Sequence, residues 1–371
     1  MVGLRRAMAV VVLSVLASAL TAVIPALAAG TWWQQLAATP ARLRAVASDP
    51  GGSPLALVGS GLGWYTPAKG RLVGVGLPRS AAAWGSPVAV ASRSGLGVAA
   101  FSGGRVEEIR AGGGAPRRLG QLPAGATSLA VGAGSRPLVV ATTSAGLFAA
   151  RLGGRFRLVA RGNATRVLAP PRAGLAWLAL VDGRVLRLGG GRWRSLPGAP
   201  RLDHASDALA ELGDGVVLAA EPSGLVWRGS GRAWAVAFQV LPVGGLGGVP
   251  RVTALVADGP SAAYLATDGF GTLLTPDGGY TWYRASPPVA SVTGLAAVGP
   301  VFAPRARGYV LALGRGEVFR HQLQALPGPP SYRGGRHFSE LAGTALVTAA
   351  TCAVVLGLLW YRSRRRRALS V

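Results

Sequence analysis

The sequence is poor in cysteine, lysine and acidic residues, and each shortage limits what the protein can be. Cys352 is the only cysteine among 371 residues, so a folded domain cannot be held by disulfides and must rely on its own core. Lys69 is the only lysine. Lysine and arginine together number 39 against 14 acidic residues, which gives a formal net charge of +25. So few carboxylates argue against chemistry that needs clustered Asp and Glu.

Other residue types are abundant, and they favour a turn-rich protein with a membrane-embedded part. The chain contains 56 glycines and 26 prolines, half of its residues are hydrophobic, and only 14% are charged. This composition is neither that of a disordered chain nor that of an ordinary soluble one. The length allows two ordinary domains or one large all-β domain.

The N-terminal segment, residues 1–29, has the features of an export signal. Arg5 and Arg6 precede an apolar run that ends in Ala26-Leu27-Ala28, with small residues where a signal peptidase reads the chain. The run is also long enough to span a bilayer as an uncleaved anchor. We therefore expect a signal peptide or a signal anchor.

A second apolar segment, residues 340–361, predicts a transmembrane helix. Residues 362–371 follow it as a basic tail, which belongs on the cytoplasmic side and contains Arg362, Arg364, Arg365, Arg366 and Arg367. A Pro/Gly-rich linker, residues 327–339, precedes the predicted helix. Both ends place residues 30–326 outside the cytoplasm, with one membrane span if the signal is cleaved and two if it is not.

The positive charge belongs mainly to the exported region. Between Gly30 and Ser339 there are 32 basic and 13 acidic residues, a net charge of +19. Such a domain could contact anionic envelope polymers, lipid headgroups or acidic proteins. The candidate anion contacts are Arg117, Arg118, Arg305 and Arg307. The alternative is that these arginines only form a solvated surface.

A repeat of about forty residues organises this region. Similar units, each with β-prone runs separated by glycine-containing breaks, begin near residues 43, 87, 127, 165, 207, 252 and 292. This is the spacing of four-stranded propeller blades. The sequence therefore predicts an all-β fold, a seven-bladed β-propeller. A strand from around residues 32–36 could close the last blade, and such closure would remove exposed edges. The sequence leaves this alternative open.

One turn is better kept than the others. Thr275-Pro276-Asp277-Gly278-Gly279-Tyr280-Thr281-Trp282 fits the pattern Ser/Thr-x-Asp-x-Gly-x-Thr-Trp. Its structural positions are Thr275, Asp277, Gly278, Gly279, Thr281 and Trp282. The motif resembles the Asp-box, or BNR, repeat of bacterial sialidases, sortilin-type receptors and photosystem II assembly-factor propellers. The resemblance implies a propeller and says little about chemistry.

Aromatic residues recur after the turn between the third and fourth strand of a unit. Trp193, Trp234 and Trp282 occupy this place, and Phe156 and Phe319 look like degenerate versions of it. We interpret them as wedges between blades, because large aromatic side chains dominate core burial.

Catalytic and metal-binding constellations are not recognisable. A sialidase-like site needs an arginine cluster, a tyrosine with a nearby glutamate, and an aspartate, but Tyr264, Tyr280, Tyr283 and Tyr309 have no such surroundings. Adjacent Glu107 and Glu108 would point to opposite faces of a strand.

The histidines, His204, His321 and His337, are far apart, and Asp203, His204 and Asp207 are better explained as a loop. We expect no enzyme activity, cofactor, metal or nucleic-acid partner.

The function expected from the sequence is a membrane-tethered, extracytoplasmic scaffold that binds an envelope protein. The photosystem assembly factors that the chain resembles bind partner proteins through an arginine-rich surface. They lack a C-terminal membrane helix, and this departure argues against a photosynthetic role. The alternatives are a carbohydrate-active ectodomain, sialidase-like or lectin-like, and a sensor whose basic tail meets a cytoplasmic partner.

Overall fold

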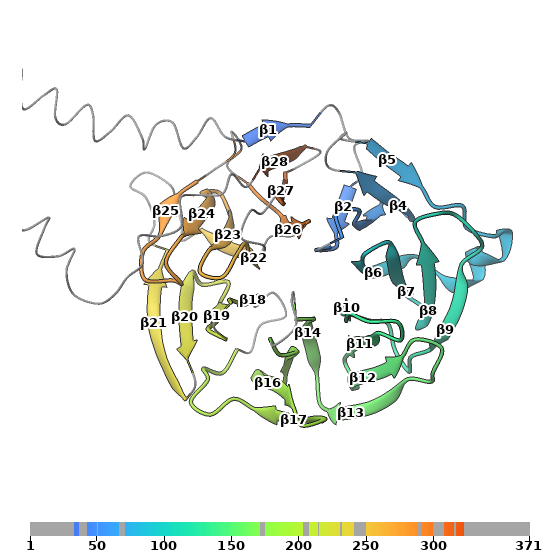
Figure 1. Cartoon of the computed structure of the whole chain (residues 1–371), viewed down its shortest axis with the longest axis horizontal. Coiled ribbons are helices and arrows are strands. Elements are labelled where there is room, and N and C mark those ends of the chain that lie inside the picture. Colours follow the sequence, from blue (N-terminus) through green and yellow to red (C-terminus); the bar gives the residue numbers. More distant parts are fainter. Residues whose placement is uncertain are drawn as a thin grey trace, which may run out of the picture. The chain divides into compact units, whose positions relative to one another are not determined.

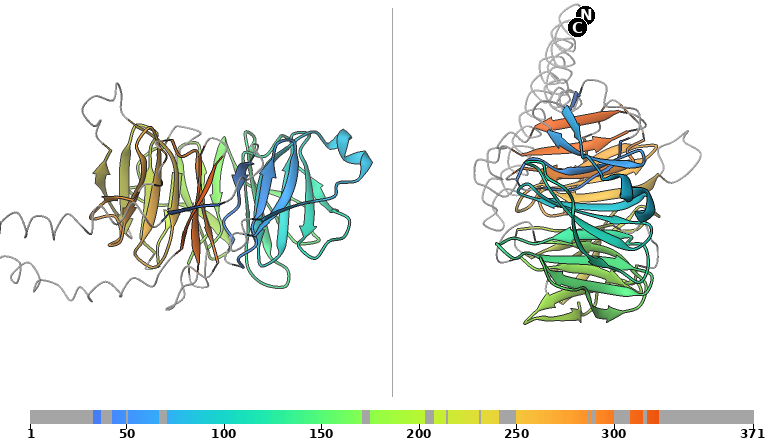
Figure 2. Two further views of the ribbon diagram at one scale, coloured as in Figure 1. Left: turned by 90° about the horizontal axis from the view of Figure 1, so that it is seen from above. Right: turned by 90° about the vertical axis from the view of Figure 1, so that its right-hand side faces the viewer.

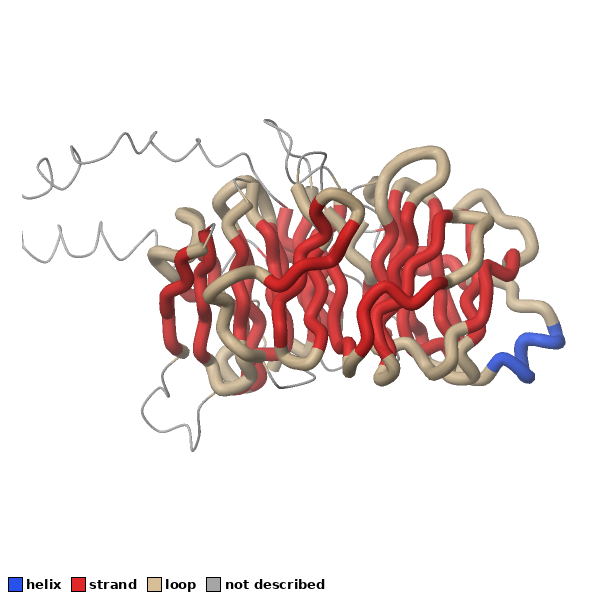
Figure 3. The backbone as a smooth tube through the Cα atoms, turned by 90° about the horizontal axis from the view of Figure 1, so that it is seen from below, coloured by secondary structure: helices blue, strands red, loops and turns tan. Residues whose placement is uncertain are grey.

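The computed structural model is a ring of seven four-stranded antiparallel sheets (Figure 1). It describes residues 33–36, 43–49, 51–66, 71–170, 175–202, 208–213, 215–230, 232–240, 250–285, 287, 289, 291–299, 308–314 and 317–322. The predicted all-β, seven-bladed propeller is confirmed. The strands stand between two faces made of loops (Figures 2 and 3).

Six blades each use four consecutive strands. Blade 1 contains β2 (Leu43–Val46), β3 (Leu55–Val58), β4 (Gly61–Thr66) and β5 (Arg71–Gly74). Blade 2 contains β6 (Pro87–Arg93), β7 (Leu96–Phe101), β8 (Arg105–Arg110) and β9 (Arg117–Gln121). Blade 3 contains β10 (Ser128–Val131), β11 (Leu138–Thr143), β12 (Gly146–Arg151) and β13 (Arg157–Arg161).

The next three blades follow the same order. Blade 4 contains β14 (Ala164–Leu168), β15 (Leu178–Val181), β16 (Arg184–Gly189) and β17 (Arg192–Ser195). Blade 5 contains β18 (Ala208–Glu211), β19 (Val217–Ala220), β20 (Leu225–Ser230) and β21 (Ala233–Gln239). Blade 6 contains β22 (Arg251–Ala257), β23 (Ala263–Asp268), β24 (Gly271–Thr275) and β25 (Tyr283–Arg284).

Blade 7 is completed by the N-terminal strand. It contains β26 (Gly294–Val298), β27 (Tyr309–Leu313), β28 (Val318–Gln322) and, as its outer strand, β1 (Trp33–Gln35). β1 pairs antiparallel with β28, and Trp33 lies opposite His321. The ring is therefore closed by segments almost 300 positions apart, and the exposed edge that an open ring would leave is removed.

The hydrophobic core is divided among the blade interfaces. Seven buried clusters lie between neighbouring blades, one at each interface around the ring. Central strands such as β15 and β19 are buried at every position, because each has a blade on both faces. Valine, leucine and alanine suit such strands, since small and branched side chains let adjacent sheets approach closely.

Only one helical element lies in the described part of the chain, the 3-10 helix η2 (Arg79–Trp84) between blades 1 and 2. No helix among these residues is long and apolar enough to cross a membrane. The expected signal segment, residues 1–29, and the expected transmembrane segment, residues 340–361, lie outside the described residues.

The tryptophans after the third strands pack between blades, but one expected equivalent was wrong. Trp193, Trp234 and Trp282 each pack against the cluster shared with the preceding blade. Phe319 is buried on β28, which is a third strand, so it does not follow the corresponding turn. Trp33, on the outer strand β1, takes that place in blade 7.

An aromatic cluster fixes the closing strand. The ring of Trp33 lies 5.3 Å from that of His321 and 6.0 Å from that of Tyr264 on β23. The indole Nε1 of Trp33 donates to the carbonyl of Ala285 at 2.7 Å. The Tyr264 hydroxyl and His321 Nδ1 share a hydrogen bond of 2.9 Å. Burial lowers the pKa of His321 to about 4, so the imidazole is neutral near pH 7.

The closure should weaken in mild acid. Because the folded pKa of His321 is depressed from 6.5 to about 4, its contribution to stability is complete above pH 6.5 and is lost as the pH falls through 4. The free energy of unfolding should drop by up to about 3 kcal/mol over this range. Urea unfolding of the wild type and of His321→Gln, compared from pH 7 to pH 4, measures the loss.

The glutamine variant is the control, because it retains an amide that can bond Tyr264 but does not titrate. The other titratable groups of the cluster are the same in both proteins and cancel in the difference; they include Tyr264, whose pKa is raised by burial and by the nearby Asp258. Equal pH slopes for the two proteins would show that His321 does not control closure.

Candidate functional site

The Asp-box turn of blade 6 is held by its own carboxylate. Asp277 Oδ1 accepts hydrogen bonds from Thr275 Oγ1 at 2.9 Å and from the N–H groups of Tyr280 and Thr281 at 3.1 and 2.9 Å. Its Oδ2 accepts one from Thr281 Oγ1 at 2.6 Å. Although desolvation raises the pKa of Asp277, these bonds lower it overall. The carboxylate is thus occupied inside the turn.

The same turn also joins blade 6 to blade 5. Arg228, on β20, donates through Nε to the carbonyl of Gly278 at 2.9 Å and lies 4.2 Å from the centre of the Tyr280 ring. A side chain at Gly279, where φ is +97°, would come within 2.8 Å of Leu218 Cδ2 in blade 5. The ring of Trp282 stacks on Phe238 of β21 at 5.7 Å. We call this contact the blade 5–6 seam.

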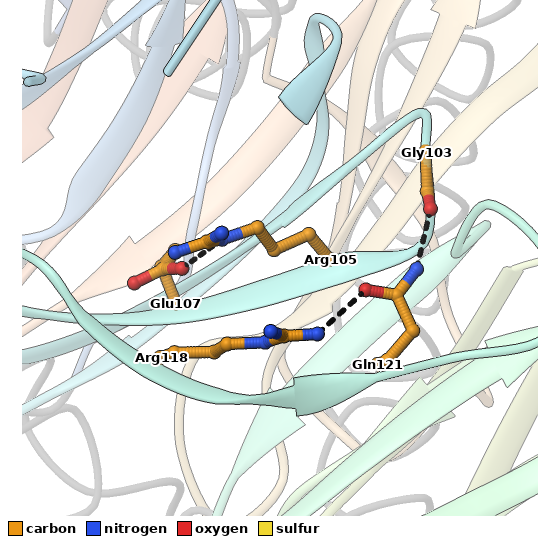
Figure 4. A network of polar contacts seen from close by, with 5 residues as sticks. All are labelled: Gly103, Arg105, Glu107, Arg118 and Gln121. Atoms are coloured by element: carbon orange, nitrogen blue, oxygen red, sulfur yellow. Dashed lines mark hydrogen bonds and ion pairs between the residues drawn. The ribbon is translucent and has the colours of Figure 1, made fainter. Parts of the chain in front are cut away.

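Two adjacent glutamates of β8 are buried and oppositely directed. Glu107 is fully buried and forms an ion pair with Arg105, whose guanidinium lies 4.1 Å from the centre of the Trp84 ring. Glu108 pairs with Arg110 at 2.7 Å. Each glutamate pairs with an arginine two positions away, which lies on the same side of the strand. The two carboxylates therefore lie on opposite sides and cannot act together as a catalytic pair. Figure 4 shows the Glu107 pair beside Arg118.

The central channel is lined by residues from the first strands of all seven blades and has a volume of about 270 Å³. Its charged side chains are Arg93, Arg166 and Glu211. Arg93 Nη1 donates to the carbonyl of Pro170 at 2.7 Å. Glu211 accepts from the N–H of Ala176 at 3.0 Å and pairs with Arg187 at 3.4 Å, and burial raises its pKa. The Arg93 bond reaches from blade 2 to the loop after β14 in blade 4, and the Glu211 contacts join blade 5 to the neighbouring blade 4.

The outer strands of blades 2, 3 and 4 carry an arginine-rich surface, which we call the cationic rim. It comprises exposed side chains from β9, β13 and β17: Arg117, Arg118, Arg157, Arg161, Arg192 and Arg194. Arg118 donates to Gln121 at 3.3 Å, and Gln121 donates to the carbonyl of Gly103 at 2.6 Å (Figure 4).

Few acidic groups offset the cationic rim. From residue 71 to residue 202 the sequence contains three acidic residues. Two of them, Glu107 and Glu108, are buried, and the exposed Asp182 lies 3.8 Å from Arg184. This part of the surface therefore has a strong excess of positive charge.

The candidate residues from the sequence are thus separated in space. Arg117 and Arg118 belong to blade 2, and the Asp-box belongs to blade 6. Arg305, Arg307, the tail arginines 362–367 and the loop with Asp203, His204 and Asp207 lie outside the described residues. No group of three metal-ligating side chains occurs in the part of the chain that the structure describes. Sequence reasoning missed Arg157, Arg161, Arg192 and Arg194, because they become neighbours only after folding.

Comparison with known proteins identifies the fold. No protein-family model matches the sequence, and no curated protein matches it. The WD40 repeats of RRP9 align with a TM-score of 0.60 and 11% identity, covering 79% of this chain and 98% of that one. YCF48 bound to D1 peptide aligns with a TM-score of 0.58 and 14% identity, covering 80% and 96%.

A GH74 enzyme from Niastella koreensis is also similar, with a TM-score of 0.53 and 16% identity. The alignment covers 76% of this chain but 43% of the enzyme. At these identities the similarities establish a propeller fold and do not transfer a function.

Loss of the Asp277 carboxylate should weaken blade 6. Asp277→Ala leaves four donors without their acceptor, so we expect a destabilisation of about 1–3 kcal/mol at pH 7. Asp277→Asn should cost less. Because the folded pKa lies below 3.8, the carboxylate's contribution is present above that pH and is lost as the pH falls through the folded pKa. The difference between wild type and Asp277→Asn should therefore shrink in acid.

Urea unfolding at pH 7 and at pH 3 measures both effects. Asp268→Ala is the matched control, because that exposed carboxylate accepts a bond from Ser291 at 2.5 Å outside the turn. An Asp277→Ala protein as stable as the Asp268→Ala protein would contradict the structural role.

Proposed function

We propose that this chain is a membrane-tethered, extracytoplasmic propeller that binds an acidic envelope protein and acts as an assembly scaffold without catalysing a reaction. The observation that carries the proposal is the cationic rim. Six exposed arginines occupy three neighbouring outer strands, while the acidic residues of the same blades are largely buried. A surface of one sign attracts partners of the other sign and repels a second copy of itself.

The state of the carboxylates supports a non-enzymatic role. Glu107, Glu108 and Glu211 are each paired with an arginine. Asp49 is fully buried and accepts from the N–H groups of Gly51 and Ser94. Hydrolysis of a glycosidic bond needs two accessible carboxyl groups across a substrate. Bonds inside and between blades occupy these groups instead.

The propeller shape also fits a scaffold. YCF48, a structural neighbour, is described in complex with a D1 peptide, so a propeller of this size can present a surface to a protein segment. The tether is proposed from the two apolar segments at the ends of the sequence and the arginines after the second one. Anchoring at the membrane would hold the rim near envelope proteins.

Reversing the rim charge should weaken partner capture. We expect each of two double variants, Arg157→Glu/Arg161→Glu and Arg192→Glu/Arg194→Glu, to weaken the binding free energy by about 1.4 kcal/mol, which is a tenfold change in affinity. Recovery of a cross-linked protein partner from membranes should fall accordingly. The wild-type interaction should also weaken as salt increases. Cross-linking in membranes, followed by pull-down of the full chain, measures recovery.

The matched control is Arg79→Glu/Arg136→Glu, which makes the same charge change at exposed sites off the outer strands. It should retain capture. Equal losses in rim and control variants would indicate a general charge effect. Recovery of polysaccharide without a protein would contradict the scaffold proposal.

The proposed topology has its own test. Protease added outside intact spheroplasts should digest the propeller, whereas an epitope placed after Arg367 should survive until the membrane is permeabilised. Immunoblotting against each part reads the result. Protection of the propeller before permeabilisation would contradict an extracytoplasmic location.

A further inference from the structure

Outer strand β21 differs from the other outer strands. With seven residues it is the longest of them, and its sequence, AWAVAFQ, contains no charge. The outer strands of the other consecutively built blades each contain at least one arginine: β5, β9, β13, β17 and β25. The closing strand β1 is uncharged but has three residues.

This difference matters because an outer strand is a sheet edge. One side of β21 pairs with β20, and no other described strand pairs with it. Its other side therefore presents backbone N–H and C=O groups that another strand can bind. Proteins protect such edges with charges or by keeping them short. β21 has neither of these protections. Its one register shift against β20 lies between Val236 and Phe238, which leaves Ala233–Val236 regularly paired, and the Val236 side chain is 52% exposed.

The surroundings of β21 are suited to a protein partner. Ala235 lies opposite Arg228 of β20, and the ring of Tyr280, 69% exposed, covers that arginine. Phe238, at the other end of β21, stacks on Trp282. Aromatic residues and arginine are enriched at protein interfaces and supply many of their strongest contacts. The blade 5–6 seam thus places such groups beside an open edge.

We propose that β21 is a strand-addition site for an extended segment of the acidic partner, with an apolar, β-branched centre and acidic ends. Backbone pairing would supply the affinity, and contacts at Val236 and Tyr280 would select the segment. Charge complementarity at the strand itself selects the acidic ends: exposed Arg232 directly precedes β21 and Arg228 lies opposite Ala235, in a domain whose overall net charge is +19. A second copy would bring the same charge. This inference rests on the proposed scaffold function and adds the location and chemistry of one contact.

The test uses a fluorescent nine-residue peptide, Glu-Glu-Val-Thr-Val-Thr-Val-Glu-Glu, and the full chain. We expect saturable binding by fluorescence anisotropy and slower amide hydrogen exchange within residues 233–239. The same peptide with lysine in place of each glutamate should bind at least tenfold more weakly. Absence of binding, or protection confined to other strands, would overturn the proposal.

Backbone pairing is tested from both sides. Successive N–H groups of a strand point in opposite directions, so of Ala235→Pro and Val236→Pro one removes an outward donor and the other an inward one. The variant with an unchanged unfolding temperature should lose peptide binding at least tenfold. Gly74→Pro, on the outer strand β5 and at a position whose N–H faces away from β4, is the control and should bind normally.

Peptide variants keep the test independent of folding. N-methylation at the third, fifth and seventh residues, or at the fourth and sixth, blocks one side of the added strand or the other. One pattern should abolish binding and the other should preserve it. Equal binding of both would overturn strand addition, as would sedimentation showing that the chain self-associates while the β21 proline variant does not. If the peptide does not bind although rim reversal still reduces partner capture, the scaffold function is supported and the β21 site is refuted.

Discussion

The structure depends on closure of the ring by β1 and β28. No blade has a core of its own, because the buried clusters lie between blades and each needs two of them. A gap at one interface would expose two sheet faces. Trp33 prevents this by packing on Tyr264 and His321 and by bonding to Ala285. A few N-terminal residues therefore have an effect on stability far larger than the length of their strand suggests.

Several of the few acidic residues are buried inside the propeller and do not reach its surface. Asp49, Glu107, Glu108 and Glu211 are buried and bonded within or between blades. The three glutamates neutralise Arg105, Arg110 and Arg187, so they leave the arginines of the cationic rim without an acidic counterpart. The cationic rim is accordingly a consequence of both composition and placement. Composition alone gives the net charge, whereas the fold decides which sign faces the solvent.

The blade number could be predicted from the sequence because every blade needs four strands and three turns of similar length. The first strands begin at residues 43, 87, 128, 164, 208, 251 and 294, each within two residues of the expected start. The closing strand could not be fixed in this way, since three residues carry no period and their partner is remote. For the same reason Phe319 was assigned the position that Trp33 holds. The Asp-box turn was readable because its bonds are local.

The rim and the β21 edge escape sequence analysis for a common reason. Outer strands that are about forty residues apart become neighbours only when the blades pack together. No short segment of the sequence therefore shows the arginine cluster, or shows that β21 is an outer strand without a charge. On the folded ring, arginines on β9, β13 and β17 protect sheet edges from unwanted pairing, and in the proposed function they would also attract an acidic partner. An uncharged outer strand gives up that protection. In the proposed function the arginines would attract the partner to the propeller, and β21, seven residues without a charge, would be the edge left unprotected for strand addition.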